Sequence, residues 1–421
     1  MKTYEIKETI EIKGEYDVIV AGGGVAGAAA AVQARRLGKS VLLIEKSITL
    51  GGLATIGLIN LFVPMCNGRG VQIIKGMCQE FVDLSIKYGF DTVPSDWIDR
   101  DPPKDTNQRY VTKYSVPIFI MALTELMQNE GVELLFDTIV SKPVMEDGVC
   151  KGVIVENKSG REMYMCKMLV DTTGDADVLY RAGVPTVDRG NYHTYFGYGA
   201  TLDSCKAAYE NEDMRHLGKM FISPNCNANL FGGGQPEGKP LWSGTDVRDI
   251  TQYVIEGQTE ILNTVKNDDR KKREIFQIPT MVQFRTTRRI DGDYVMTTDD
   301  VYKHFDDSIG AINDFTYKDL LYEVPLRSLV KTGFPNMITA GRSAAGEGYA
   351  WDVIRVIPPA IITGQAAGAA AALAIDENRA IYDVDIAKLQ EILESQNVMV
   401  HFDDALVPDT DEREEVDIGH I

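Results

Sequence analysis

The segment at residues 16–55, YDVIVAGGGVAGAAAAVQARRLGKSVLLIEKSITLGGLAT, constrains the fold of this chain more than any other part. An apolar strand, Val18–Ala21, runs into a glycine loop that fits the pattern G-x-G-x-x-G. An Ala-rich helical segment follows, and then a second apolar strand, Val41–Ile44, which ends at Glu45. Because these parts come in the order of a dinucleotide-binding β-α-β unit, the segment predicts that a dinucleotide binds here.

Each of these residues has a separate structural role. Gly22 permits the tight turn, Gly24 lets the backbone approach a pyrophosphate, and Gly27 lets the helix pack closely on the strand. The diphosphate is expected at the helix N-terminus, where N–H groups and the positive end of the helix dipole meet its charge. Glu45 is suited to accept hydrogen bonds from the hydroxyls of a ribose.

The composition is that of an ordinary globular protein and excludes several classes of partner. The 421 residues are 44% hydrophobic and 25% charged, enough for about two or three domains with a large core. The net charge of −19 argues against nucleic acid or an anionic membrane as a partner. The N-terminus has no signal-peptide core, and the apolar segment Pro359–Ile375 is shorter than the roughly 20 residues of a membrane span. We therefore expect no membrane contact and a cytoplasmic location.

The cysteines and histidines give no support for a metal site. No C-x-x-C, H-x-x-x-H or H-E-x-x-H pattern occurs, and the chain has only five histidines. The cysteines are widely separated and are interpreted as buried thiols in a reducing compartment: Cys66, Cys78, Cys150, Cys166, Cys205 and Cys226. We expect no bound metal.

The order of elements predicts an α/β fold in which one domain is discontinuous. A clear helix is expected at residues 117–129, a strand at 132–140 and a three-stranded β-meander at 144–170. The sequence pattern then changes to aromatic residues and short apolar runs. A predicted strand at Met337–Ala340 marks the return to the pattern of the first part of the chain. A long helix begins with paired prolines that suit its first turn, and a last amphipathic helix covers Asp385–Ser395.

These changes in the sequence pattern predict the domain boundaries. A Rossmann-like domain with the β-meander comprises residues 1–60, 110–190 and 327–421. Residues 61–109 are predicted to be an insertion with one helix, and residues 191–326 an inserted, mixed α+β substrate or cap domain.

Several ordered blocks resemble a known family and indicate which dinucleotide binds. Gly51–Thr55 resembles the G-G-x-x-T segment of FAD-dependent oxidoreductases of the glutathione-reductase-like fold. The blocks Asp171–Pro185, Arg285–Val301 and Ile338–Ile375 are similar to the bacterial FAD-dependent oxidoreductase family. The resemblance covers most of the chain and implies non-covalent FAD, because no histidine follows Gly51–Gly52 where some fumarate-reductase-like enzymes attach their flavin.

The resemblance also implies which residues hold FAD. Those at the pyrophosphate, ribose and ribitol would be Gly22, Gly24, Ala26, Gly27, Glu45, Lys46, Gly51, Gly52, Leu53, Thr55, Gly341 and Arg342. Val140 would meet the adenine through backbone groups, with Thr173 and Gly174 close by. The helix that starts at Ile357, Pro359 and Ala360 would point its N-terminus at flavin N1 and O2, where reduced flavin carries negative charge.

One position departs from the family pattern. Relatives often carry a His-Glu pair a few residues after the A-G-R turn, and this chain has Gly348 and Tyr349 there. If that pair is the acid and base in relatives, this chain must use other groups.

Four residues are candidates for the substrate chemistry, each with a structural alternative. Arg285 and Arg288 suit a clamp on a carboxylate or oxyanion, or else form salt bridges with nearby aspartates. His193 is either a proton shuttle or a structural histidine. Tyr349 either stacks on substrate or closes the core.

The sequence therefore predicts hydride transfer between a small organic substrate, with a carboxylate as one option, and FAD. A flavin monooxygenase or halogenase-like reaction and a vestigial flavin-binding module are the alternatives. The sequence indicates neither the substrate nor the electron partner.

Overall fold

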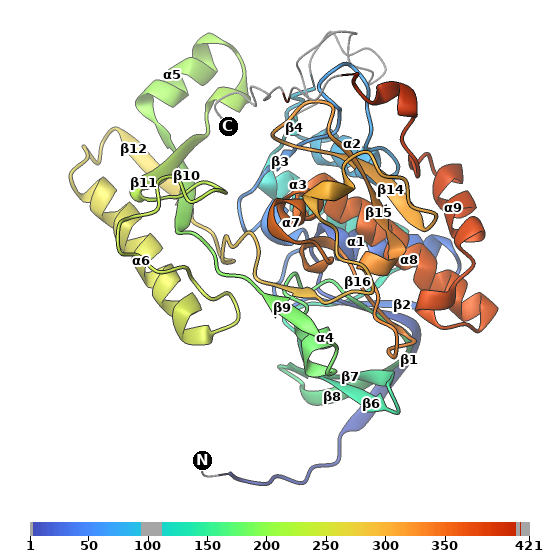
Figure 1. Ribbon diagram of the computed structural model, residues 1–421. Helices are drawn as coiled ribbons and strands as arrows, with labels where there is room; N and C mark the ends of the chain where they lie inside the picture. The colour runs from blue at the N-terminus through green and yellow to red at the C-terminus, as the bar shows by residue number, and fades with distance from the viewer. Residues whose placement is uncertain (1–2, 94–111, 410–412, 414–421) are drawn as a thin grey trace.

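The centre of the protein is a seven-stranded sheet, seen in a computed structural model that describes residues 3–93, 112–409 and 413 (Figure 1). Its strands run in the order β5-β2-β1-β8-β7-β6, and β16 also pairs with β8. The parallel members are β1 Glu11–Ala21, β2 Val41–Ile44, β5 Glu133–Leu135, β8 Gly160–Asp171 and β16 Met337–Thr339. The predicted α/β class is confirmed, and strands from both ends of the chain share one sheet.

Strand β8 joins the parallel sheet to the meander. Its first half pairs antiparallel with β7 (Val149–Asn157), which pairs in turn with β6 (Ile139–Glu146). Its second half lies between β1 and β16, with Leu169 opposite Met337. The single strand predicted at residues 132–140 is wrong, because Asp137 adopts a left-handed backbone conformation (φ +51°) and divides the segment into β5 and β6.

Helices α1 (Val25–Arg36) and α8 (Ile357–Glu377) pack directly on each other against the sheet. A Cβ added to Gly364 would come within 2.2 Å of the Ala26 carbonyl oxygen, and one on Gly368 within 2.3 Å of that of Ala30. Only glycine allows so close an approach of two helix backbones. The Gly/Ala pattern of both helices is therefore a packing requirement, and α2 (Met77–Ile86) and α3 (Val116–Asn129) extend the same core.

Helix α8 is longer than the sequence-based estimate. Among the described residues it is the one helix long and apolar enough to cross a membrane, with 21 residues and a mean hydropathy of 1.3. However, 94% of its most apolar window is buried inside the protein. This burial makes α8 a core helix; the cytoplasmic location stays a prediction.

A smaller lobe lies to one side of this core, in green and yellow in Figure 1. It contains the antiparallel strands β11-β10-β12 and the helices α5 and α6. Its hydrophobic cluster is mainly aromatic, with Tyr195, Trp242, Tyr253 and Phe284. The bounds are β10 Thr194–Thr201, α5 Leu202–Glu210, β11 Lys219–Asn227, α6 Val247–Lys266 and β12 Arg273–Gln277. We call these elements the cap.

Parts of the predicted cap and insertion pack on the main core instead. Strands β14 (Ser308–Asn313) and β15 (Leu321–Pro325) contribute Ile309 and Tyr322 to the core that contains α1 and α8. Helix α2, inside the predicted insertion 61–109, does the same, and residues 94–109 of that insertion lie outside the described residues. The shorter elements are β3 Leu61–Phe62, β4 Thr112–Lys113, α4 Asp177–Arg181, β9 Thr186–Asp188, β13 Arg288–Ile290, α7 Gly348–Arg355 and α9 Ile386–Ser395.

Candidate functional site

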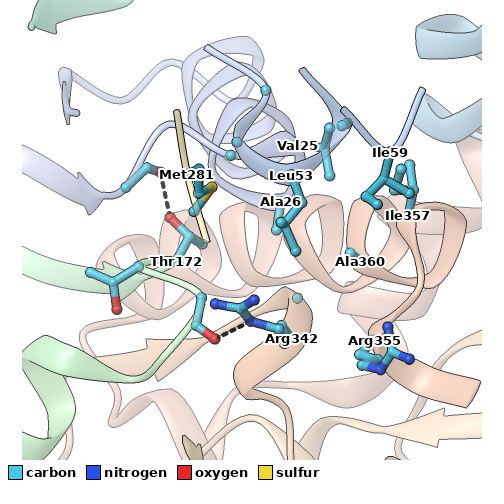
Figure 2. Close-up of a pocket in the computed structure, with 18 of the residues that line it drawn as sticks. Val25, Ala26, Leu53, Ile59, Thr172, Met281, Arg342, Arg355, Ile357 and Ala360 are labelled. Atoms are coloured by element: carbon cyan, nitrogen blue, oxygen red, sulfur yellow. Dashed lines mark hydrogen bonds between the residues drawn. The ribbon is translucent and has the colours of Figure 1, made fainter. Parts of the chain in front are cut away.

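A cavity of about 420 Å³ lies where the carboxyl ends of the parallel strands meet the cap. Figure 2 shows Val25, Ala26 and Leu53, from the N-terminal part of the chain, across the cavity from Arg342 and Arg355. The predicted cofactor residues that line it are Gly22, Gly24, Ala26, Glu45, Lys46, Gly51, Gly52, Leu53, Val140, Thr173, Gly174, Gly341, Arg342, Ile357 and Ala360. Three predicted residues, Gly27, Thr55 and Pro359, are not part of the lining.

The first glycine loop is held against the strand that follows the meander. Gly22 has a φ of +104°, and the Thr172 hydroxyl donates to its carbonyl at 2.7 Å. A Cβ on Gly27 would lie 1.9 Å from the Gly22 carbonyl oxygen, so Gly27 serves close packing beneath the loop. A Cβ on Gly24, in contrast, would meet no protein atom within 4 Å, because that position faces the open cavity.

The second glycine loop lies on the first. The Gly51 N–H donates to the Gly23 carbonyl at 2.8 Å, and Gly24 and Gly51 form a parallel bridge. Thr55 is fully buried below this loop, and its hydroxyl donates to the Leu50 carbonyl at 2.6 Å. Thr55 therefore shapes the loop, and the predicted place of its side chain in the cofactor lining is wrong.

Glu45 stands at the carboxyl end of β2, as the motif predicts. One carboxylate oxygen accepts the Gly23 N–H at 2.6 Å and the other accepts the Ser47 N–H at 2.8 Å. The carboxylate thus ties the glycine loop to the end of β2, while the side chain still forms part of the cavity wall.

Arg342 joins three segments at the far side of the cavity. Its guanidinium donates to the carbonyls of Gly174 and Phe284, and it pairs with Asp175 at 2.5 Å. Through these contacts Arg342 fixes the wall where β8, the A-G-R turn and the cap meet. Arg342 also lines the cavity, and its place near the ribitol and phosphates stays a prediction.

The N-terminus of α8 opens onto the cavity at Val356, Ile357 and Ala360. It has no side-chain cap, and prolines occupy two positions of its first turn. Pro359 is buried and has no N–H, so only its neighbours in this turn face the cavity. The uncapped positive end of a long helix favours negative charge at this place.

Arg285 is the predicted catalytic residue that does line the cavity. Its guanidinium donates to the Ala228 carbonyl at 3.0 Å and to the Thr194 hydroxyl at 3.3 Å. No ion pair forms between Arg285 and a carboxylate of the described residues. Burial, and after it the charge of Arg355, lowers the pKa of Arg285 to about 10.

Arg288 does not reach the cavity, so the predicted two-arginine clamp is wrong. Its guanidinium pairs with Asp177 at 2.7 Å, donates to the Asp175 carbonyl and stacks over Tyr180. Arg288 begins β13, and its side chain turns toward Asp177 and Tyr180 of α4, whereas Arg285 precedes this strand.

His193 lies in the aromatic core of the cap and is not part of the cavity lining. The Trp242 indole N–H donates to His193 Nδ1 at 2.9 Å, which requires that this nitrogen carry no proton. Burial, and then the charge of Lys239, lowers the pKa of His193 to about 4. The predicted proton shuttle is therefore not supported at this cavity.

Tyr349 lies behind the cavity wall and does not line it. Its hydroxyl donates to Asp314 at 2.9 Å, and its ring stacks on Phe231. Burial, and then the charge of Asp314, raises the pKa of Tyr349 well above its usual range. The ring of Tyr349 packs against Phe315, which lines the cavity. Tyr349 therefore supports the cavity wall, and its predicted stacking on substrate is not supported.

The residues around the cavity are suited to FAD. The space in front of Gly24 is open, and α1 begins there with no side-chain cap on its first N–H groups. Such an uncapped helix start is suited to a diphosphate. Residues of both glycine loops, Glu45 and the start of α8 surround one continuous cavity, so the residues present fit a long dinucleotide.

The model of the family "FAD dependent oxidoreductase" matches residues 17–195 and 204–393. The chain belongs to this family. FAD is its cofactor, as the resemblance implied. Which lining residue contacts which part of FAD stays a prediction.

Named relatives of this flavoprotein match only part of it. It is 25% identical to a digeranylgeranylglycerophospholipid reductase of Sulfolobus acidocaldarius over 207 residues, 43% of this chain and 44% of that protein. It is 28% identical to the tRNA uridine 5-carboxymethylaminomethyl modification enzyme MnmG of Lactobacillus johnsonii over 183 residues, 42% of this chain and 25% of that protein. The matches therefore cover less than half the length of these relatives.

Solved structures are similar at low sequence identity. A geranylgeranyl bacteriochlorophyll reductase-like protein of Thermoplasma acidophilum has 15% identity and a TM-score of 0.43, covering 93% of this chain and 85% of its own. A p-nitrophenol 4-monooxygenase of Pseudomonas putida has 11% identity and a TM-score of 0.47, covering 94% and 91%.

Sequence reasoning missed several lining residues of the flavoprotein. Gln283 bridges the cap and the FAD side, because its amide accepts the Phe196 N–H at 3.0 Å and donates to the Gly57 carbonyl at 2.9 Å. Arg181 donates to the Val140 carbonyl at 2.8 Å, so that carbonyl, predicted to meet the adenine, already has a donor. Arg355 lines the cavity just before α8, and its place ahead of V-I-P-P was the one available signal.

Proposed function

We propose that this flavoprotein transfers a hydride between FAD and a small organic substrate that carries a carboxylate. The observation that carries the proposal is the guanidinium of Arg285, which lines the cavity without an ion-pair partner among the described residues. A half-buried cation without a counter-ion is costly, and an anionic substrate would supply that charge.

The charges around Arg285 support an anionic ligand. Asp352 is buried and pairs with both Arg189, at 3.2 Å, and Arg355, at 2.8 Å. Among the described residues, Asp352 is thus the ion-pair partner of two guanidinium groups, and that of Arg285 has none. The excess positive charge lies beside the uncapped start of α8, which adds to it. A bidentate contact of a carboxylate with a guanidinium is the strong form of such recognition.

The rest of this end of the cavity is apolar and supports a small hydrophobic substrate body. Leu230, Met281 and Phe315 line it, together with Phe196. These side chains would exclude water and hold the substrate by its apolar part, while Arg285 and Arg355 orient its acid group. Bound FAD would supply the hydride acceptor or donor at its flavin ring.

Anaerobic flavin reduction tests the proposal. The FAD-loaded protein is mixed with small carboxylates and with their amides, and the absorbance of flavin near 450 nm is followed. We expect bleaching by a carboxylate and not by its amide. Arg285→Ala should lower kcat/KM about 10- to 100-fold, the value of a hydrogen bond to a charged group, and Arg285→Lys should restore part of it.

Arg288→Lys is the matched control, because Arg288 pairs with Asp177 and does not line the cavity. Its rate should stay within about twofold of the wild type, since lysine keeps a positive charge beside Asp177. The proposal is overturned if Arg285→Ala binds FAD normally and is reduced as fast as the wild type. Product formation only in the presence of oxygen would favour the monooxygenase or halogenase-like alternative instead.

A further inference from the structure

A cluster of two histidines and one glutamate lies outside the FAD cavity. Nδ1 of His304, the carboxylate of Glu323 and Nδ1 of His401 each offer a ligand atom, and these atoms all lie within 4.8 Å of one another. The three residues come from the segment before β14, from β15 and from the chain after α9. None of them lines the FAD cavity.

Glu323 is the buried member of this cluster, with a fully buried side chain. Its carboxylate accepts the Phe305 N–H at 2.7 Å and lies 2.6 Å from His304 Nδ1 and 3.0 Å from His401 Nδ1. No lysine or arginine pairs with it in the part of the chain that the structure describes. A buried carboxylate without a positive counter-charge is costly, and among the described residues the two imidazoles are the groups that pair with it.

The second nitrogen of His304 has the partner that metal-binding histidines usually have. Its Nε2 lies 2.9 Å from a carboxylate oxygen of Asp404, while the ring stacks on Phe402. In metal sites, the ring nitrogen that does not bind the metal normally donates to such a carboxylate, which orients the ring and fixes its tautomer. Asp404 thus holds His304 with Nδ1 directed at Glu323.

We propose that His304, Glu323 and His401 bind a divalent transition metal, Zn²⁺ in the first place, with water as the remaining ligand. Two imidazoles and one carboxylate form a donor set typical of zinc. In a tetrahedral zinc site with bonds of about 2.0–2.1 Å, ligand atoms lie about 3.3 Å apart. Modest side-chain rotations would therefore bring the three groups into register.

The proposed role is structural. The Ser308 hydroxyl donates to the Val400 carbonyl, and the Ala311 N–H donates to that of Met399, so the chain after α9 already lies along β14. A metal held by residues 304, 323 and 401 would fasten this segment to β15. The ion would therefore stabilise the protein without taking part in the chemistry at FAD.

Zinc binding to the FAD-loaded protein tests this site. Protein freed of metal with a chelator is titrated with Zn²⁺ by calorimetry, and its Tm is measured with and without the ion. We expect one zinc per chain and a rise in Tm. His304→Ala and His401→Ala should each bind zinc at least about tenfold more weakly, since each loses a ligand. His216→Ala, a change of an exposed histidine on the cap, should bind it as the wild type does.

Asp404→Asn keeps the test decisive if either ligand variant fails to fold, because Asp404 is exposed and only its contact with His304 is altered. This variant should bind zinc about tenfold more weakly. The proposal is overturned if wild-type protein binds no zinc at one per chain. It is also overturned if folded His304→Ala, His401→Ala and Asp404→Asn bind zinc with wild-type affinity.

Discussion

The two walls of the FAD cavity are built by different means. On the side of the parallel sheet, backbone forms the wall: two glycine loops touch each other, and α1 and α8 present uncapped N-termini. On the cap side, side chains form it, with Arg285, Gln283 and Phe284 reaching in from a lobe whose core is aromatic. In the first wall, a Cβ added at Gly22 or Gly27 would meet backbone atoms, whereas the second wall can exchange side chains without moving backbone.

From this difference we expect the two walls to serve different ligands. The backbone wall is predicted to hold the diphosphate and ribose parts of FAD. The wall of side chains can change its charge and shape by single substitutions, and it is predicted to select the substrate. Variants in both walls test this difference, in order of decreasing expected effect.

Gly27→Ala should cause the largest loss of stability, since its Cβ would lie 1.9 Å from the Gly22 carbonyl oxygen. The backbone must shift to remove this contact, which costs about 3 kcal/mol or more of unfolding free energy. Chemical denaturation of the FAD-free protein measures it.

Gly24→Ala is the matched control, because its Cβ would meet no protein atom. The FAD-free variant should unfold like the wild type but bind FAD at least about tenfold more weakly, the equivalent of about 1.4 kcal/mol. Equal loss of stability in both variants would contradict the view that Gly27 serves packing and Gly24 serves the cofactor.

His193 should make the free energy of unfolding depend on pH in the acid range. Its pKa falls from 6.5 to about 4 on folding, so the unfolded chain binds the extra proton between these values and stability rises with pH there. The contribution is complete above pH 6.5 and is lost as the pH falls toward 4. It amounts to up to about 3 kcal/mol.

The measurement is the difference in unfolding free energy between wild type and His193→Gln from pH 7.5 to 4.5, which cancels the titration of other groups. Glutamine can still accept the Trp242 N–H but does not titrate. A difference that does not change with pH would show that His193 is not held neutral in the cap.

Thr172→Val should have the smallest effect. The hydroxyl of Thr172 donates to the carbonyls of Ala21 and Gly22 at 3.0 and 2.7 Å, and with Glu45 it holds the first glycine loop. Its loss should cost about 1 kcal/mol of unfolding free energy and weaken FAD binding slightly. Thr172→Ser keeps the donor and should behave as the wild type; an equal loss in both variants would assign the effect to packing.

The sequence predicted the backbone wall well, because its parts are local. Gly22, Gly24 and Glu45 lie within one β-α-β unit, where spacing along the chain determines position in space. Thr55, which was assigned through the resemblance of the segment Gly51–Thr55, was misplaced, since a sequence match does not tell which way a side chain turns. Its hydroxyl has a backbone acceptor in the loop itself, and it turns inward to reach it.

The cap wall was predicted poorly, because its residues meet only through tertiary structure. Arg285 and Arg288 are three positions apart in the sequence, yet one lines the cavity and the other pairs with Asp177. His193 was a reasonable candidate until the structure placed its ring against Trp242. The cluster at His304, Glu323 and His401 has no sequence signature at all, since its members share no local spacing.

The pairing of α1 with α8 has a consequence for how this protein is made. During synthesis on the ribosome, α1 and its two neighbouring strands emerge long before Met337, where the last strand of their sheet begins. Until α8 follows, the alanine face of α1 and the free edge of β8 remain open to other chains. Chains that have not yet reached α8 should therefore aggregate instead of persisting as FAD-free protein, and the sheet is complete and covered only once β16 and α8 have been synthesised.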